Sequence, residues 1–293
     1  MTPARRPTPR RAKARMEGNV LLAIDIGNTE VTLGLFVGRK LARSFRVSSE
    51  TRRTADEAGL LLRHVFPELG AAAAAAAGAG KEPSSERAAV LASVVPPQTP
   101  IYVEAVKRLL GRAPLEVTAD TASGITIEDR DPSAVGADRI ANAVAAIEKY
   151  GAPVIVVDFG TATTFDVILK GGRYRGGVIA PGILTGAEQL VRRAARLGAF
   201  ELKAPKRVVG QSTEESLQSG VLYGAAGQVD AIVRRIIAEE RIRPRVIATG
   251  GLAKAIAPHA KTIEKADADL TLHGLRLIHA RAGGTKRGET AVK

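Results

Sequence analysis

Two short segments of the sequence place an aspartate directly after a run of apolar residues. Residues 21–36 read LLAIDIGNTEVTLGLF and residues 154–169 read VIVVDFGTATTFDVIL, so Asp25 and Asp158 each precede a glycine-containing, Asn- or Thr-rich turn. Glycine lets the backbone approach a ligand closely, and the N–H, amide and hydroxyl groups after it can surround a phosphate. A carboxylate repels phosphate unless a cation lies between them, and carboxylates with substrate phosphates commonly hold magnesium. The repeat therefore favours two phosphate-binding turns.

Each turn also has a purely structural interpretation, because Asp and Gly are favoured turn residues and one such hairpin needs no ligand. Two matched turns, in which Gly27 corresponds to Gly160 and Asn28 to Thr161, favour the phosphate interpretation. A repeat of this kind also predicts two related halves that present their turns to a shared cleft.

A third aspartate lies beside an arginine at the start of a strongly predicted helix. In GADR, residues 136–139, both Asp138 and Arg139 fall in the first helical turn. The helix dipole favours an acid there, so a capping role is the alternative. As functional groups, the carboxylate can accept the proton of a hydroxyl that attacks a γ-phosphate, and the guanidinium suits bidentate capture of a substrate carboxylate. These residues and the two turns are sufficient for phosphoryl transfer.

The elements that must position these residues mix strands with helices. Strands are predicted at 20–26, 31–37, 40–47, 88–95 and 245–248, with a strand–turn–strand unit from 154 to about 175, and helices at 55–66, 101–110, 136–149, 185–197 and 214–240. This mixture predicts an α/β fold in which helices flank mixed sheets. We expect halves at 18–135 and 136–280, disordered tails at 1–17 and 281–293, and a mobile alanine-rich loop at 71–86.

The composition excludes several classes of protein. The 293 residues contain no cysteine, which excludes disulfide scaffolds, thiolate zinc sites and a cysteine nucleophile. No apolar run is long enough for a membrane span, and we expect a cytoplasmic protein without a signal peptide. The net charge is +13, but residues 1–17 carry +5 and residues 281–293 carry +3, so nucleic-acid binding is not favoured. Met16 is an alternative start of the chain.

Five motifs occur in a fixed order: DIGNT (25–29), GADR (136–139), DFGTATT (158–164), GGVIAPG (176–182) and TGG (249–251). Together they resemble the type III pantothenate kinases, a family of the acetate and sugar kinase/Hsc70/actin superfamily, over roughly residues 20–280. The resemblance implies two ribonuclease H-like halves of the actin-like ATPase fold with a cleft between them. It also implies ATP-dependent phosphorylation of pantothenate to 4′-phosphopantothenate, the first step of coenzyme A synthesis, by a homodimer.

The resemblance further implies a role for each motif. Asp138 would be the proton acceptor, Asp158 would hold a monovalent cation (K⁺ or NH₄⁺), and Thr213 would contact pantothenate near the dimer partner. The TGG motif would lie near the adenosine of ATP, which would be bound with Mg²⁺. The implied contacts to ATP come from Asp25, Ile26, Gly27, Asn28, Thr29, Glu30, Val31, Thr32 and Thr161. The implied contacts to pantothenate come from Gly136, Ala137, Asp138 and Arg139, with the guanidinium as the candidate partner of its carboxylate.

One departure from the family pattern and two alternative functions accompany this interpretation. The family often has a tyrosine seven residues before the GADR glycine, where this sequence has Asp129, so a charge replaces an apolar contact to pantothenate. The alternatives are another phosphotransferase or phosphatase of the superfamily, and a non-catalytic regulator associated with nucleic acid. The presence of all three aspartates favours an enzyme over a catalytically inactive scaffold.

Overall fold

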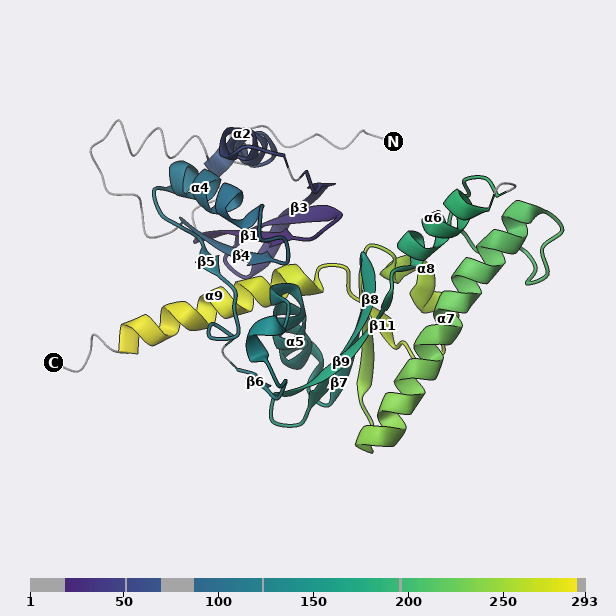
Figure 1. Ribbon diagram of the computed structural model, residues 1–293. Helices are drawn as coiled ribbons and strands as arrows, with labels where there is room; N and C mark the ends of the chain where they lie inside the picture. The colour runs from purple at the N-terminus through teal and green to yellow at the C-terminus, as the bar shows by residue number, and fades with distance from the viewer. Residues whose placement is uncertain (1–18, 51, 70–86, 123, 195–196, 289–293) are drawn as a thin grey trace, which may run out of the picture. The chain divides into compact units, whose positions relative to one another are not determined.

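The computed structural model describes residues 19–50, 52–69, 87–122, 124–194 and 197–288. The predictions for residues 1–17, for the alanine-rich segment 71–86 and for the last residues 289–293 lie outside these ranges. The described chain forms two compact units, one up to Glu116 and one from Val117. Figure 1 shows that each unit has its own sheet and its own helices.

The first unit contains a five-stranded sheet with helices on one face. Its strand order is β3-β2-β1-β4-β5, in which β2 is antiparallel to both β1 and β3, and β4 is parallel to both β1 and β5. The strands are β1 (Val20–Ile26), β2 (Glu30–Val37), β3 (Lys40–Ser48), β4 (Arg87–Ser93) and β5 (Leu115–Glu116). The helices are α2 (Ala55–Val65) and α4 (Thr99–Leu110), whose buried side chains form one core with alternate residues of β1, β2 and β4.

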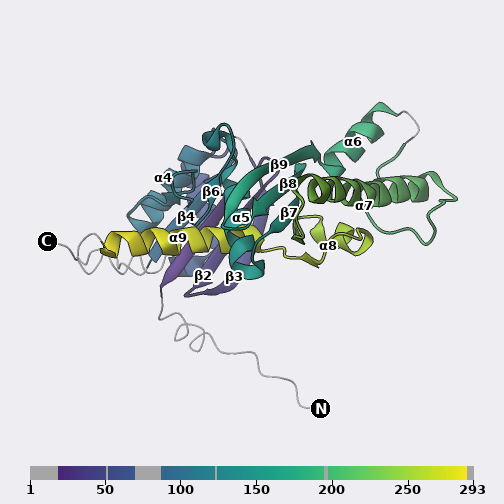
Figure 2. The same ribbon diagram turned by 90° about the horizontal axis from the view of Figure 1, so that it is seen from below.

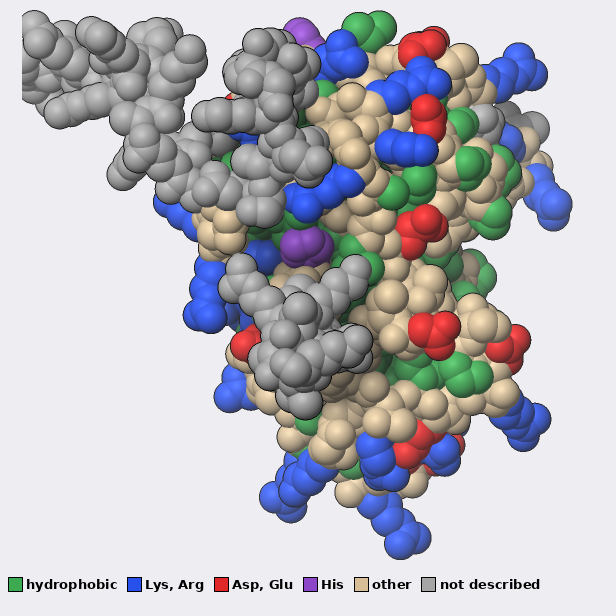
Figure 3. Space-filling model, turned by 90° about the vertical axis from the view of Figure 1, so that its left-hand side faces the viewer, with side chains coloured by type: hydrophobic (Ala, Val, Ile, Leu, Met, Phe, Trp, Pro, Cys, Tyr) green, Lys and Arg blue, Asp and Glu red, His purple; other side chains and the backbone are tan. Residues whose placement is uncertain are grey.

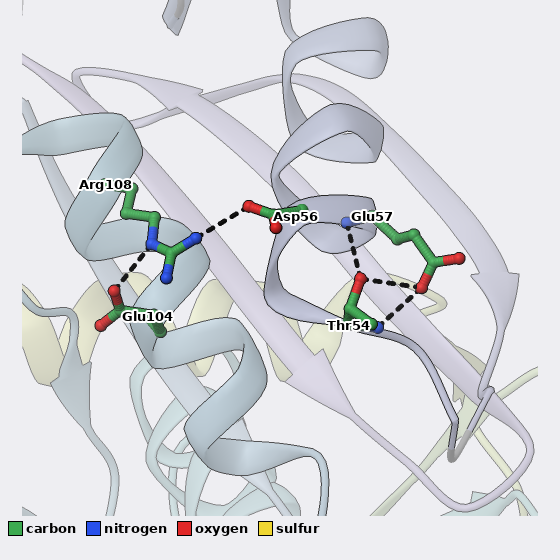
Figure 4. A network of polar contacts seen from close by, with 5 residues as sticks. All are labelled: Thr54, Asp56, Glu57, Glu104 and Arg108. Carbon is green, nitrogen blue, oxygen red and sulfur yellow. Dashed lines mark hydrogen bonds and ion pairs between the residues drawn. The ribbon is translucent and has the colours of Figure 1, made fainter.

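Helix α2 begins at a complete capping box, as the close-up in Figure 4 shows. The Thr54 hydroxyl accepts a hydrogen bond from the Glu57 N–H, and the Glu57 carboxylate accepts one from the Thr54 N–H. Arg108 on α4 donates to Glu104 on its own helix and to Asp56 on α2. The ion pairs of Arg108 are exposed to solvent, which screens them, so the apolar core rather than these pairs holds the two helices together.

The second unit contains a six-stranded sheet covered on both faces. Its strand order is β11-β10-β7-β8-β9-β6. The strands are β6 (Thr126–Ile127), β7 (Val154–Phe159), β8 (Ala162–Leu169), β9 (Arg173–Pro181), β10 (Arg245–Gly250) and β11 (Lys265–Ala266). The helices are α5 (Ala137–Tyr150), α6 (Ile183–Arg193), α7 (Thr213–Glu240), α8 (Ala253–Ile256) and α9 (Leu270–Gly288), with short 3-10 turns at Pro132–Ala134 and Ala257–His259.

The two faces of this second sheet are packed by different helices. One face forms a core with α7 and α8, and α5 covers the other face, with α9 lying against α5 (Figures 1 and 2). The approach of α9 to α5 is close, because a Cβ on Gly274 would overlap with the backbone of Ala141.

The two sheets share a topology, which confirms the two related halves expected from the repeated segments. In each, the strand with the aspartate as its penultimate residue lies inside the sheet, antiparallel to the following strand and parallel to a later one. The order β3-β2-β1-β4-β5 is matched by β9-β8-β7-β10-β11, and β6 adds a further strand to the second sheet. The predicted α/β class with helix-flanked mixed sheets is therefore confirmed.

Two features differ from the sequence-based expectations. The boundary between units falls before Val117 and not at 135/136, because β6 pairs with β9 and so joins the second sheet. Residues 281–288, expected to be a disordered tail, continue α9. This helix is stabilised by the buried Leu275 and Ile278, and Arg281 pairs with Glu148 of α5 at 3.1 Å.

Candidate active site

The first predicted phosphate turn lies between β1 and β2. Asp25 is directly opposite Thr32 in the antiparallel pairing, and the Gly27 N–H closes the turn by donating to the Glu30 carbonyl at 3.0 Å. The side chains of Ile26 and Val31 are fully buried in the core, so of these two residues only the backbone can face a nucleotide. Asn28, Thr29 and Glu30 are exposed at the tip of the turn.

A buried amide supports this turn from the neighbouring segment. The Ser49 N–H donates to the Thr29 carbonyl at 2.9 Å, and Gln98 donates from Nε2 to the Ser49 hydroxyl at 2.6 Å. Gln98 is fully buried. The turn is therefore held in place by a residue that the sequence analysis did not identify.

The second turn, between β7 and β8, is one residue shorter than the first. Asp158 is opposite Thr164, six positions on, and the Gly160 N–H donates to the Ala162 carbonyl at 3.0 Å. The Thr161 carbonyl accepts a hydrogen bond from the Thr185 hydroxyl at 3.1 Å. A Cβ on Gly182 would overlap with this carbonyl, so Gly182 lets the first turn of α6 pack directly against the turn between β7 and β8. The positive end of the α6 dipole is thereby brought next to Thr161.

Asp158 lies in a polar environment on the face of the sheet that α5 covers. Asn142 of α5 donates from Nδ2 to Oδ2 of Asp158 at 2.9 Å, and Thr271 of α9 donates to Oδ1 of Asn142 at 2.8 Å. A Cβ on Gly250, in the TGG motif, would lie too close to the Asp158 carboxylate and 2.6 Å from the Phe159 carbonyl oxygen. The position of the carboxylate is therefore defined by α5 and β10, and indirectly by α9 through Asn142.

Two hydroxyl groups flank Asp158 on the neighbouring strands. Thr164 of β8 and Thr249 of β10 are each in direct register with Asp158, so their side chains lie on its face of the sheet. Both hydroxyls are buried and have no hydrogen-bond partner within the described part of the chain. In the same ranges, no group of three or more His, Asp or Glu side chains could hold a metal ion by itself. A cation here would thus be held by one carboxylate and neutral oxygens.

Asp138 and Arg139 occupy the first turn of α5, as predicted from GADR. Gly136 is the N-cap residue, and the Arg139 N–H donates to Oδ1 of Asp138 at 2.8 Å. Burial raises the pKa of Asp138, while the Arg139 charge and the backbone hydrogen bond oppose this shift. Ala137 is buried, so only its backbone can contact a ligand. A partly desolvated carboxylate of this kind is suited to general base catalysis.

The Arg139 side chain reaches across the sheet to β8. Its Nε donates to Oδ1 of Asp166 at 2.7 Å, and the Tyr174 hydroxyl donates to the same oxygen at 2.6 Å. Within the second unit, α5 and the strands beneath it therefore assemble Asp138, Arg139, Asp158 and Asp166 on one face of the sheet.

Thr213 is not brought to this group. It is the first residue of α7, is exposed, and follows Ser212, whose hydroxyl caps the helix at Glu215. Helix α7 packs on the opposite face of the sheet from α5. Within one chain, the sheet therefore lies between α7, which begins with Thr213, and the residues Asp138 and Arg139 of α5.

Sequence reasoning missed four polar residues of this region: Asn142, Asp166, Tyr174 and Thr271. For two of them, the sequence contains a pattern that could have identified them. Asn142 follows Asp138 by one helical turn, which places both on one helix face. Asp166 interrupts the apolar residues of strand 162–169, on the same face as Asp158 once the hairpin register is known. No such pattern exists for Thr271 and Tyr174, because their roles depend on tertiary packing.

Comparisons with known proteins agree with this geometry. The family model for type III pantothenate kinase matches residues 21–235. The type III pantothenate kinase of Geobacter sulfurreducens is 44% identical over 262 residues, covering 89% of this chain and 99% of the relative, and that of Moorella thermoacetica is 45% identical over 262 residues with the same coverage of each.

Among solved structures, a protein from Campylobacter jejuni described as a Baf family transcriptional activator superimposes with a TM-score of 0.52. It is 19% identical and covers 90% of this chain and 99% of its own, so this likeness shows the fold alone. The family match and the two relatives cover most of the chain, including the three aspartates and Arg139. The chain belongs to the type III pantothenate kinase family.

Proposed function

We propose that the chain catalyses ATP-dependent phosphorylation of pantothenate to 4′-phosphopantothenate, the first step of coenzyme A synthesis, with Asp138 as general base. Family membership supports the reaction. The observation that carries the residue assignment is the first turn of α5, where a carboxylate of raised pKa and a mostly buried guanidinium are adjacent in the chain.

In this reaction Asp138 accepts the proton of the pantothenate primary hydroxyl as its oxygen attacks the γ-phosphorus of ATP. The bond between the γ-phosphorus and the bridging oxygen breaks, and ADP leaves with that electron pair. Arg139 binds the pantothenate carboxylate and so fixes the distance between the hydroxyl and Asp138. Gly136 and Ala137 contribute backbone contacts at the N-terminus of α5, where N–H groups lack helical partners.

The two glycine turns are assigned to the phosphates of ATP. Asp25, Ile26, Gly27, Asn28, Thr29, Glu30, Val31 and Thr32 form the first turn, and Thr161 lies in the second. Support comes from the matched strand topology, and from the N-terminus of α6 beside Thr161, which favours negative charge. When bound, Mg²⁺ neutralises the charge that develops on the phosphates. Asp25 is the candidate carboxylate, because it lies at the base of the first turn.

Asp158 is proposed to hold the monovalent cation, K⁺ or NH₄⁺. The donor set fits such an ion, because Asp158 is flanked in register by the hydroxyls of Thr164 and Thr249, which have no other partner within the described ranges. One carboxylate with neutral oxygens suits a singly charged ion. A cation held by these oxygens would supply positive charge to the site.

We further propose a cytoplasmic homodimer in which Thr213 completes the pantothenate site of the partner subunit. Thr213 is exposed and begins α7, which in its own chain packs on the opposite face of the sheet from Asp138. Large exposed apolar side chains lie nearby in the sequence, at Leu184, Leu190, Val208 and Val209. Apolar side chains mark a protein interface when they form one contiguous exposed patch. Among the described helices, none is long and apolar enough to cross a membrane.

The charge distribution gives little support to the nucleic-acid alternative. On the face drawn in Figure 3, Asp and Glu side chains lie among the Lys and Arg side chains. A nucleic-acid-binding face typically gathers its basic residues.

The test is a coupled assay of ADP release with and without pantothenate, repeated with Na⁺ in place of K⁺. We expect release that requires pantothenate and is much faster with K⁺. Release that does not depend on pantothenate in either salt would reject this function and favour another phosphotransferase or a phosphatase of the superfamily. Salt-sensitive DNA binding without ADP release would favour the regulator.

A further inference from the structure

Asp166 is a fully buried carboxylate between two apolar residues of β8. Its neighbours Phe165 and Val167 point into the core beneath α7, so Asp166 points to the face that α5 covers. Two donors converge on its Oδ1, namely Arg139 Nε and the Tyr174 hydroxyl, while Oδ2 has no partner within the described part of the chain. The carboxylate is thus bound through one oxygen to a residue from α5 and one from β9.

Stability alone is a weak reason for this arrangement. Removing a carboxylate and a guanidinium from water is unfavourable for each ion, and apolar residues of similar volume often replace such a pair without loss of stability. The buried pair is better explained by what it does to the geometry of Arg139.

The pair fixes the guanidinium in one orientation. Because Asp166 binds Nε, the two terminal nitrogens of Arg139 are left without a hydrogen-bond partner among the described residues. The guanidinium lies over strand β9, where a Cβ on Gly177 would be only 2.9 Å from Nη2, and its carbon is 5.8 Å from the centre of the Tyr174 ring. The side chain is 16% exposed, so little solvent competes for it.

We propose that Asp166 and Tyr174 are positioning residues, which hold Arg139 by its Nε so that its terminal nitrogens face the carboxylate of pantothenate. This inference rests on the proposed function, in which Arg139 binds that carboxylate. Tyr174 contributes twice, because its hydroxyl orients Asp166 and its ring supports the guanidinium. Gly177 provides the space in which the guanidinium lies.

The test compares two acceptors: pantothenate, and its alcohol analogue, in which CH₂OH replaces the carboxylate. The variants are Tyr174→Phe, which removes one hydroxyl, and Asp166→Asn, which removes the charge. Tyr150→Phe is the matched control, because the Tyr150 hydroxyl also donates to a carboxylate, Asp267, at 2.7 Å. Tyr150 ends α5, about 18 Å along the helix from Asp138.

We expect the KM for pantothenate to rise about tenfold in Asp166→Asn and severalfold in Tyr174→Phe, as for loss of a charge-assisted hydrogen bond. The kcat should change less than KM, and the KM for the alcohol should stay within about twofold because Arg139 forms no ion pair with it. Wild type should prefer the carboxylate, and this preference should shrink in both variants but not in Tyr150→Phe. If these residues had only a structural role, the variants would change the KM values for the two acceptors by the same factor.

The failures are distinguishable. If the wild-type protein shows no pantothenate-dependent ADP release, the proposed function is wrong. If the wild-type protein is active but Tyr174→Phe changes the KM values for pantothenate and for the alcohol equally, or changes neither, the positioning role is overturned and the proposed function stands. Tyr174→Phe decides the matter if Asp166→Asn does not fold.

Discussion

Asn142 on α5 donates a hydrogen bond to Asp158 on β7, with 2.9 Å between Nδ2 and Oδ2. The amide is itself oriented by Thr271 of α9, which donates to its Oδ1 at 2.8 Å. Helix α9 therefore reaches the proposed cation site through a buried amide.

Asn142→Leu should weaken both the fold and the cation site. The change removes the hydrogen bond from Asn142 to Asp158, which as a bond to a charged group contributes about 1.5–3 kcal/mol to the unfolding free energy, and it removes one restraint on the carboxylate. We expect a higher K⁺ concentration for half-maximal ADP release, measured by potassium titration beside urea denaturation. Thr271→Val should have a smaller effect in the same direction. An unchanged potassium dependence in Asn142→Leu would show that Asn142 does not position Asp158.

Asp138→Asn should remove the general base while keeping the fold. Proton acceptance by a side chain contributes about 10²–10⁴-fold to a rate, so kcat should fall by that order while ATP binding persists. The matched control is Glu148→Gln on the same helix, which removes only an ion pair with Arg281. Stopped-time assays and nucleotide-binding calorimetry separate the two quantities. Near-normal turnover in Asp138→Asn would remove this residue from the base role.

The pH dependence of turnover should show an acid limb set by Asp138. Burial raises the pKa of this carboxyl above its ordinary value of 3.8, and the Arg139 charge opposes the rise. The base must be ionised, so kcat falls as the pH drops through the raised pKa. Replacing Arg139 with Met removes the opposing charge, so the limb should move to higher pH. Rates from about pH 4 to 8 measure this shift. A limb that moves to lower pH in Arg139→Met would contradict the assignment.

Local patterns of residues predicted much of the fold, and tertiary contacts account for the rest. The residues before Asp158 form a continuous apolar run, which predicts strand β7. Ile140 and Val144 lie at helical spacing, which predicts helix α5. Helix α9 was not predicted, because its basic, glycine-containing residues form a helix through packing on α5. The roles of Asp166 and Tyr174 required the register of β8 with β9, which a single sequence does not contain.

Gly250→Ala should damage the site through its backbone. Gly250 has φ of +89°, which costs other residues about 1–3 kcal/mol, and its Cβ would crowd Asp158 and the Phe159 carbonyl. We expect a lower melting temperature and a large loss of ADP release. Gly224→Ala is the control, since a Cβ there meets no atom within 4 Å and lies in α7, where alanine is the better helix former. Equal stability of the two variants would contradict this account.

Thr249→Val should separate stability from cation binding, because the two effects have opposite signs. The Thr249 hydroxyl is buried without a hydrogen-bond partner in the described ranges, so replacing it with a methyl group should leave the unfolding free energy equal or higher. If this oxygen helps Asp158 to hold K⁺, the potassium concentration for half-maximal turnover should nevertheless rise severalfold.

Thr163→Val provides the control for this change. The Thr163 hydroxyl is also buried without a partner among the described residues, but it pairs in register with Phe159 and so lies on the opposite face of the sheet from Asp158. It should show the same stability gain with unchanged potassium dependence. Loss of stability in Thr249→Val, or the same potassium shift in both variants, would mean that the hydroxyl beside Asp158 has another role than to bind the cation.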